Sequence, residues 1–255
     1  MDKSSSEVLK PEWVKEYQEH LDALWFQSVS LNANIYLLRR ISEFPWHWSP
    51  PNESLCWSLI SDALYHNSVM TIWRMVCDVD KDVLSVRKLR ASIMRNVRDD
   101  EARNYITARL KELKFDERAR SAQAVEQVRN EWIAHIHRKS SATLLAQGMG
   151  TPRVPAETLY GLADAVHELI EALSFDSGRA TSYDGYDKYS TMSSRDRTDF
   201  ERVLDMIAAN HPVINMPEEQ PDFWQDYKLG MTGSDRALFN MYRCRSGLPA
   251  VSWSD

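Results

Sequence analysis

The sequence predicts an all-α protein, and three observations support this fold class. Apolar residues recur at the three- and four-residue spacing of amphipathic helices in most segments of the chain. Only 8 glycines and 10 prolines are present in 255 residues, whereas an all-β architecture needs a turn about every ten residues. The hydrophobic share of 43% and the charged share of 27% are ordinary for a folded domain. We therefore expect an almost wholly helical fold.

Two long helices are predicted in the first third of the chain. The first runs from Pro11 to about Ile41, because its apolar residues lie on one helical stripe: Tyr17, Leu21, Leu24, Leu31, Ile35 and Leu38. A proline-rich loop then leads to Ser54, which is expected to cap a second helix ending near Cys77. We expect this second helix to be central to the core, with its buried stripe at Leu59, Ala63, Met70 and Trp73, widened by Trp57, Ile60 and Leu64.

Polar cap residues mark the helices of the middle segment. Ser85 precedes one helix and Asp99 begins the next. Asp116 is expected to cap a helix that continues without interruption to about Lys139, because an aspartate accepts hydrogen bonds from free backbone N–H groups there. Pro155 opens a further helix, since proline suits the first helical turn.

The composition changes near residue 174 and suggests three regions. Residues 1–175 form the predicted helical bundle, and residues 176–195, rich in Ser, Asp, Tyr and Gly, form a flexible linker. Residues 196–255 form an irregular, partly helical C-terminal extension packed on the bundle. Short helices are expected from Phe200 to Ala209 and from Asp235 to Tyr242.

Charge and hydropathy limit the classes of partner and compartment. The net charge is −6, which argues against non-specific coating of nucleic acid. Between Arg87 and Lys139, however, 14 lysines and arginines face 8 acidic residues, so this segment carries +6. It would attract a polyanion, or else form a solvated helical face with internal ion pairs. No apolar run suggests a membrane span or a secretory signal, so we expect a cytoplasmic protein with no membrane contact.

The three cysteines suggest neither a disulfide framework nor a zinc site. Cys56, Cys77 and Cys244 are odd in number, widely separated, and free of any C-x-x-C pair. We expect them to be small core residues.

One arginine interrupts the apolar stripe of the segment from Ala122 to Lys139. On a helical wheel Arg129 falls among Val125, Trp132 and neighbouring isoleucines. A guanidinium cannot lose its charge and is costly to desolvate, so it needs an anionic partner, water or a ligand phosphate. His135 lies at the edge of the same stripe, where an imidazole can transfer protons near neutral pH.

The heptapeptide RNEWIAH, from Arg129 to His135, resembles the signature of the HEPN superfamily. That signature is an arginine, usually followed by a polar residue, and a histidine separated from the arginine by four to six residues; five residues lie between Arg129 and His135. The upstream segment SLISDALYHNSVMTIWRMVCDVDKDVLSVRKL resembles the abortive-infection U-type branch. The resemblance covers residues 10 to 175 and implies an antiparallel helical bundle of HEPN type.

The resemblance also implies roles for individual residues in metal-independent RNA cleavage. His135 would act as general acid or base on the 2′-hydroxyl or the leaving oxygen, Arg129 would neutralise the scissile phosphate, and Asn130 would help to orient it. HEPN domains usually pair, so a homodimer with both motifs around one RNA strand is expected. No cofactor and no metal are needed.

Five further residues are predicted to contact the substrate: His66, Trp132, His137, Arg138 and Lys139. His137 stands where HEPN toxins that are controlled by a nucleotidyltransferase commonly carry a tyrosine, so that control is not implied. It lies about 160° from His135 on a regular helix, which disfavours a shared metal. His66 lies on the predicted core stripe, where an interior histidine is the competing interpretation.

Three hypotheses of function follow. The first is an endoribonuclease of a bacterial defence or toxin system, with an antitoxin or defence-system partner. The second is a catalytically inactive HEPN-type module that binds RNA or a protein partner. The third is a purely structural helical dimer, in which Arg129 pairs with Glu126 or Asp62 in the core.

Overall fold

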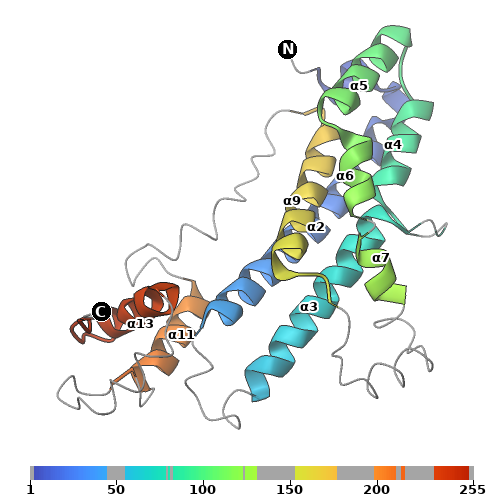
Figure 1. The fold of residues 1–255 in the computed structure, drawn as a ribbon. Coiled ribbons are helices and arrows are strands. Elements are labelled where there is room, and N and C mark those ends of the chain that lie inside the picture. The colour runs from blue at the N-terminus through green and yellow to red at the C-terminus, as the bar shows by residue number, and fades with distance from the viewer. Residues whose placement is uncertain are drawn as a thin grey trace. The chain divides into compact units, whose positions relative to one another are not determined.

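The protein is all-α in the part of the chain that the structure describes. A computed structural model describes residues 3–44, 55–78, 80, 83–122, 124–130, 153–176, 198–210, 214–215 and 233–252. These residues form helices and no strand, apart from an isolated antiparallel bridge between Leu9 and Val97 (Figure 1). The predicted fold class is therefore confirmed.

The chain divides into two compact units. Unit 1 contains residues 1–35 and 64–182, and unit 2 contains residues 36–63 and 183–255. Residues 196–255, which the sequence predicts as a C-terminal extension, belong to the same unit as residues 36–63. The predicted linker of residues 176–195 lies almost wholly outside the described residues.

The N-terminal segment forms the predicted long helix. A short helix α1 (Ser5–Val8) and a 3₁₀ turn η1 (Pro11–Trp13) precede α2 (Val14–Glu43). The six apolar residues of the predicted stripe, from Tyr17 to Leu38, are all buried. The hydroxyl of Tyr17 donates to the carbonyl of Leu173 at 2.9 Å and accepts from the backbone of Phe175 at 3.1 Å. The helical spacing therefore identified the buried face of α2 correctly.

The second helix, α3 (Leu55–Val76), forms where it was predicted but buries a different face. Its buried residues all lie from the middle of the helix onward: Tyr65, Ser68, Val69, Ile72, Met75 and Val76. Leu55 and Leu59 are 63% and 62% exposed. The prediction that the stripe through Leu59 and Ala63 is the core face is wrong. Apolar residues occur on several sides of this helix, so the sequence did not single out one face.

Two helix caps are confirmed in unit 1. The Ser85 side chain accepts from the backbone of Lys88 at the start of α4 (Val86–Arg95). The Asp99 side chain accepts from Ala102 at 2.8 Å at the start of α5 (Asp100–Glu112). Each cap satisfies a backbone N–H group that the first helical turn leaves free.

The predicted continuous helix from Asp116 to Lys139 is interrupted. The structure has α6 (Phe115–Ser121) and then α7 (Ala124–Val128). Lys114, not Asp116, is the N-cap of α6, and it adopts a left-handed conformation with φ of 50°. Ala122 is the C-cap of α6, and its carbonyl contacts the Cys77 thiol at 3.7 Å. The prediction failed because neither Gly nor Pro marks this break in the sequence.

An arginine of α5 holds the C-terminal end of α9 (Ala156–Ala172). Pro155 precedes this helix as predicted. The Arg109 guanidinium donates to the carbonyls of Ala172 and Glu171 at 3.1 Å and of Ser174 at 3.0 Å. Charged donors are strong partners for the carbonyl groups that a helix end leaves free. Helix α9 also packs against α6.

We expect Arg109→Ala to lower the free energy of unfolding by about 1–3 kcal/mol, the usual worth of hydrogen bonds to a charged group. Chemical denaturation of the whole chain measures the change. Arg103→Ala is the matched control, because Arg103 lies exposed on the same helix, and its effect should stay within about 0.5 kcal/mol. Equal losses in the two variants would contradict this role of Arg109.

Unit 2 has its own apolar core. Helices α11 (Asp199–Asn210) and α13 (Gly233–Arg245) pack together, in line with the two short helices predicted for this region. The core consists of Phe44, Leu204, Ala208, Ile214, Phe239, Tyr242 and Val251. Arg243 is buried and donates to the carbonyls of Ile214 at 2.7 Å and Pro249 at 2.9 Å. These bonds hold non-helical backbone on the helices.

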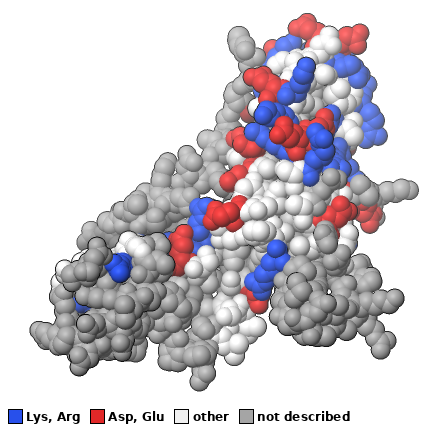
Figure 2. Space-filling model, in the orientation of Figure 1, with Lys and Arg blue, Asp and Glu red and all other residues white. Residues whose placement is uncertain are grey.

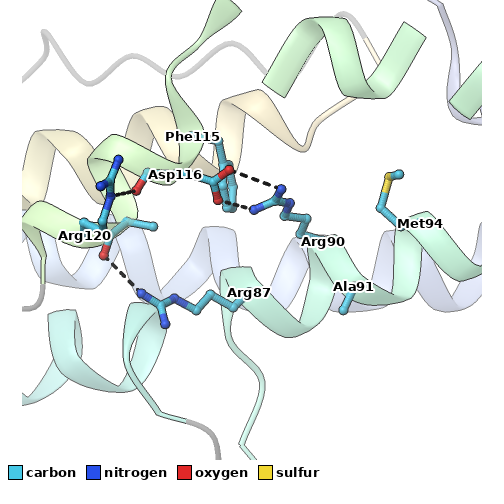
Figure 3. A pocket seen from close by; sticks show the side chains of 8 residues that line it. Arg87, Arg90, Ala91, Met94, Phe115, Asp116 and Arg120 are labelled. Carbon is cyan, nitrogen blue, oxygen red and sulfur yellow. Dashed lines mark hydrogen bonds and ion pairs between the residues drawn. The ribbon is translucent and has the colours of Figure 1, made fainter. Parts of the chain in front are cut away.

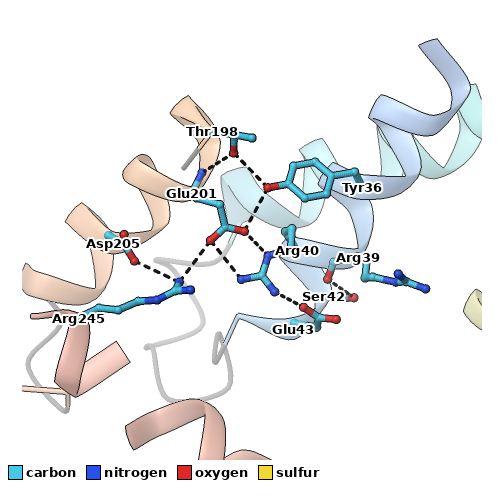
Figure 4. A network of polar contacts seen from close by, with 9 residues as sticks. All are labelled: Tyr36, Arg39, Arg40, Ser42, Glu43, Thr198, Glu201, Asp205 and Arg245. Carbon is cyan, nitrogen blue, oxygen red and sulfur yellow. Dashed lines mark hydrogen bonds and ion pairs between the residues drawn. The ribbon is translucent and has the colours of Figure 1, made fainter. Parts of the chain in front are cut away.

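A buried carboxylate joins three helices of unit 2 (Figure 4). Glu201 of α11 is 0% exposed and forms ion pairs with Arg40 of α2 and Arg245 of α13. Arg245 also pairs with Asp205 at 3.3 Å. The hydroxyl of Tyr36 donates to Glu201 at 3.2 Å. Burial disfavours the charged carboxylate, but the hydrogen bonds and charge of Arg40, with that of Arg245, outweigh it and lower the pKa of Glu201.

The cysteines do not all lie in the core. Cys77 is half-buried, whereas Cys56 and Cys244 are exposed, and all three are free thiols. The expectation that they are core residues is therefore wrong for two of them. In the described part of the chain, no helix has the length and apolar character needed to cross a membrane.

The three thiols should differ in reactivity. Burial raises the pKa of Cys77 to about 11, with the negative charge of Glu126 adding to the effect. The thiolate is the reactive form, so at pH 8 we expect Cys56 and Cys244 to be alkylated at least about tenfold faster than Cys77. Mass spectrometry of the labelled native protein measures this, and unfolding in denaturant should remove the difference. Equal labelling of all three in the native protein would contradict it.

Candidate phosphate-binding site

Arg129 lies at the end of α7, where the helix changes its form. The backbone of Arg129 and Asn130 is π-helical, directly after the last α-helical residue, Val128. Val125 and Val128 are buried, while Arg129 and Asn130 are half-buried. Single π-helical turns within helices are frequent at functional sites. The backbone therefore places these two polar side chains at the edge of an apolar face.

Two contacts fix the guanidinium of Arg129. It lies over the ring of Trp73, with 3.8 Å between Cζ and the ring centroid. Its Nη1 donates to the side-chain oxygen of Asn130 at 2.7 Å. Stacking on the indole face and a bond to a neutral amide hold the plane of the cation without neutralising its charge. Asn130 is thus the residue that orients Arg129.

No carboxylate among the described residues forms an ion pair with Arg129. The pairing with Glu126 or Asp62 that the sequence left open is accordingly not formed within them. The Nε of Arg129 and the Nε1 of Trp73 are both buried, and within this part of the chain neither has a hydrogen-bond partner. Such donors are costly to bury. Among the described residues, the positive charge of Arg129 thus has no acidic partner.

Apart from His66, the other predicted site residues lie outside the described residues. These are Trp132, His135, His137, Arg138 and Lys139. The structure thus brings together Arg129, Asn130 and Trp73. Sequence reasoning assigned Trp73 to a core stripe and missed its role as the platform for Arg129. A tryptophan at a helical position gives no signal that separates the two roles.

His66 is not an interior histidine. It is exposed on α3, beside the buried Tyr65, with 5.6 Å between the two ring centroids. The prediction that His66 lies on the core stripe is wrong for the same reason as for Leu59: the buried face of α3 is the one that carries Tyr65, Val69 and Ile72.

Positive charge in the segment from Arg87 onward is interspersed with negative charge. Figure 2 shows lysines and arginines alternating with acidic residues over α4, α5 and α6. Arg90 pairs with Asp116, and Arg118 pairs with Glu168 at 2.8 Å. Of the two interpretations of this segment, the described part matches a solvated face with ion pairs more closely than an uninterrupted basic surface.

Metal chemistry has no candidate site in the described residues. No group of three or more His, Cys, Asp or Glu side chains there could hold a metal ion. Comparison of the chain with family models, with curated proteins and with solved structures finds no match in any of the three.

Proposed function

We propose that the protein is a metal-independent endoribonuclease in which Arg129 binds the scissile phosphate. The proposal rests on the environment of the Arg129 guanidinium. Trp73 and Asn130 fix the plane of this group, and no carboxylate among the described residues forms an ion pair with it. A preorganised cation of this kind stabilises the negative charge on the phosphoryl oxygens in the transition state. The resemblance of RNEWIAH to the HEPN signature supplies the remaining roles.

In the proposed reaction the 2′-hydroxyl of the substrate attacks the adjacent phosphorus. The bond from O2′ to phosphorus forms, and the bond from phosphorus to O5′ breaks. The imidazole of His135 takes the proton of the 2′-hydroxyl, and the His135 of a second copy gives a proton to O5′. The products are a 2′,3′-cyclic phosphate and a 5′-hydroxyl, so no water and no metal enter this step. Trp132, His137, Arg138 and Lys139 would hold the RNA on either side of the phosphate.

The proposal includes a homodimer and a cellular setting. Two copies of the motif around one RNA strand would supply two arginines and two histidines. A cytoplasmic nuclease of a bacterial defence or toxin system needs restraint, so an antitoxin or another defence-system protein is the expected partner. The alternative function is a catalytically inactive HEPN-type module that binds RNA or a protein partner.

The test is RNA cleavage in excess chelator by the wild-type protein and by His135→Ala. We expect the wild type to cut single-stranded RNA and to leave 2′,3′-cyclic phosphate ends. The variant should be at least about 100-fold slower, the usual contribution of a positioned general acid or base. Cleavage that stops on adding chelator, or that is equal in the two proteins, would contradict the nuclease proposal. RNA binding with no cleavage would favour the alternative.

A further inference from the structure

A pocket in unit 1 lies between α4 and α6, apart from the Arg129 motif. Its volume is about 470 Å³, and it is lined by two kinds of residue. Arg87, Arg90, Asp116 and Arg120 are charged, whereas Ala91, Met94, Phe115 and Ala119 are apolar. This volume is within the range of small-molecule sites, about 300–1,000 Å³. Three guanidiniums against one carboxylate leave a surplus of positive charge in the pocket.

Two of the three arginines have no carboxylate partner among the described residues. Nη2 of Arg87 donates to the carbonyl of Ala119 at 3.4 Å, and Nε of Arg120 donates to the carbonyl of Asp116 at 3.2 Å. Each guanidinium therefore keeps its charge and further N–H groups. Figure 3 shows these two guanidiniums at one end of the pocket. The surplus of positive charge at this end favours an anionic group.

Arg90 forms a flat platform in the middle of the pocket. Its guanidinium pairs with both carboxylate oxygens of Asp116 and lies 4.9 Å from the ring centroid of Phe115. The Phe115 ring and the Asp116 carboxylate fix the plane of the Arg90 guanidinium, and the Arg90 side chain is 35% exposed. Met94 and Ala91 lie at the other end of the pocket (Figure 3). Planar guanidiniums and apolar side chains are surfaces on which bases stack.

We infer that this pocket binds a nucleotide, with the phosphate on Arg87 and Arg120 and the base stacked on Arg90 toward Met94. The ligand is a terminal phosphomonoester nucleotide, either free in solution or at the end of an RNA strand. The inference goes beyond the nuclease proposal, because a nucleotide site would also serve a non-catalytic module. No contact of Arg129, Asn130 or His135 is needed for it.

The Arg87 end of the pocket lies close to the segment that leads to Arg129. The thiol of Cys77 contacts the carbonyl of Ala122 between α6 and α7. The charges of Arg87 and Glu126 both act on this thiol. Cys77 follows Trp73, the platform of Arg129, by about one helical turn.

The test is a calorimetric titration of the full chain with adenosine 5′-monophosphate, adenosine and inorganic phosphate. We expect the nucleotide to bind at least about tenfold more tightly than adenosine, because adenosine lacks the charged group. Arg87→Gln and Arg120→Gln should each weaken binding of the nucleotide by about tenfold or more. Arg95→Gln is the matched control, since Arg95 is an exposed arginine of α4 that does not line the pocket, and it should bind as the wild type does.

Several outcomes would overturn the inference. The first is that the protein binds adenosine as tightly as the nucleotide, and the second is that it binds inorganic phosphate as tightly as the nucleotide. The third is that Arg95→Gln loses as much affinity for the nucleotide as Arg120→Gln does. Arg120 is exposed, so Arg120→Gln should fold normally, and a thermal melt checks this. Oligonucleotides with and without a 5′-phosphate separate the two sources of the ligand.

Failure of this inference and failure of the nuclease proposal are distinguishable. A protein that cleaves RNA in chelator but binds no nucleotide overturns the pocket alone. A protein that binds nucleotide through Arg87 and Arg120 but cleaves nothing overturns the nuclease alone. His135→Ala should retain the nucleotide affinity of the wild type in either case.

Discussion

Arg129→Ala should slow RNA cleavage in a single turnover by about 100-fold to 1,000-fold, the range found when one preorganised donor to a transition-state oxyanion is removed. The guanidinium is held on Trp73 and by Asn130 before any substrate arrives, so no reorganisation is needed when charge develops on the phosphate. Rates measured with excess enzyme isolate this step from product release.

Two further variants separate charge from geometry at Arg129. Arg129→Lys keeps the charge but loses the planar group that stacks on Trp73, so we expect only partial recovery of the rate. Glu126→Gln changes the charge of an exposed residue on the same helix by one unit, and it should leave the rate within about threefold of the wild type. Arg129→Ala with the wild-type rate would remove Arg129 from the reaction.

Glu201→Leu should lower the free energy of unfolding of unit 2 by about 3–5 kcal/mol, the usual cost of removing one member of a buried ion pair. Glu201 is fully buried and accepts from Arg40 and Arg245, which belong to different helices. Without Glu201, the guanidiniums of Arg40 and Arg245 stay buried and lose the carboxylate that they share. Chemical denaturation followed by tryptophan fluorescence measures the effect.

Glu112→Leu is the control for Glu201→Leu, because Glu112 is exposed on α5 and should cost no more than about 0.5 kcal/mol. Glu201→Gln keeps the shape and the hydrogen-bonding oxygen, so we expect an intermediate loss. If Glu201→Leu were as stable as the wild type, the network of Figure 4 would contribute little to unit 2.

The pH dependence of unit 2 should follow the same residue. The pKa of Glu201 is lower in the folded protein than in the unfolded chain, where it takes its ordinary value. The stabilisation is therefore complete above that ordinary value and is lost as the pH falls below about 4, through the folded pKa. Glu201→Gln should remove this part of the acid dependence. An unchanged acid limb in the variant would contradict the assignment.

The helical fold and several of its boundaries could be predicted because local chemistry determines them. The stripe on α2 extends from Tyr17 to Leu38 and is buried throughout, and Ser85 and Asp99 accept bonds from the first turns of α4 and α5. Periodicity and capping act over one or two helical turns, so a single sequence contains their whole signal.

Other features depend on contacts between distant segments, which periodicity does not reveal. The break after α6 involves Cys77, 45 residues earlier in the chain. The buried face of α3 depends on which neighbours it meets. Glu201 is buried because Arg40 lies beside it, although the two are 161 residues apart. At the candidate site the sequence indicated an isolated cation at Arg129, but it did not indicate that Trp73 supports it.

If Arg129 is a fixed cation available to a phosphate, it must contribute to the affinity for RNA and to the salt dependence of that affinity. With His135→Ala as the background to prevent cleavage, addition of Arg129→Ala should weaken binding by about tenfold at low salt. The magnitude of the slope of log affinity against log salt concentration should also fall by about one, which corresponds to the loss of one phosphate contact. An unchanged slope and affinity would contradict the claim, because Arg129 would then bind no phosphate.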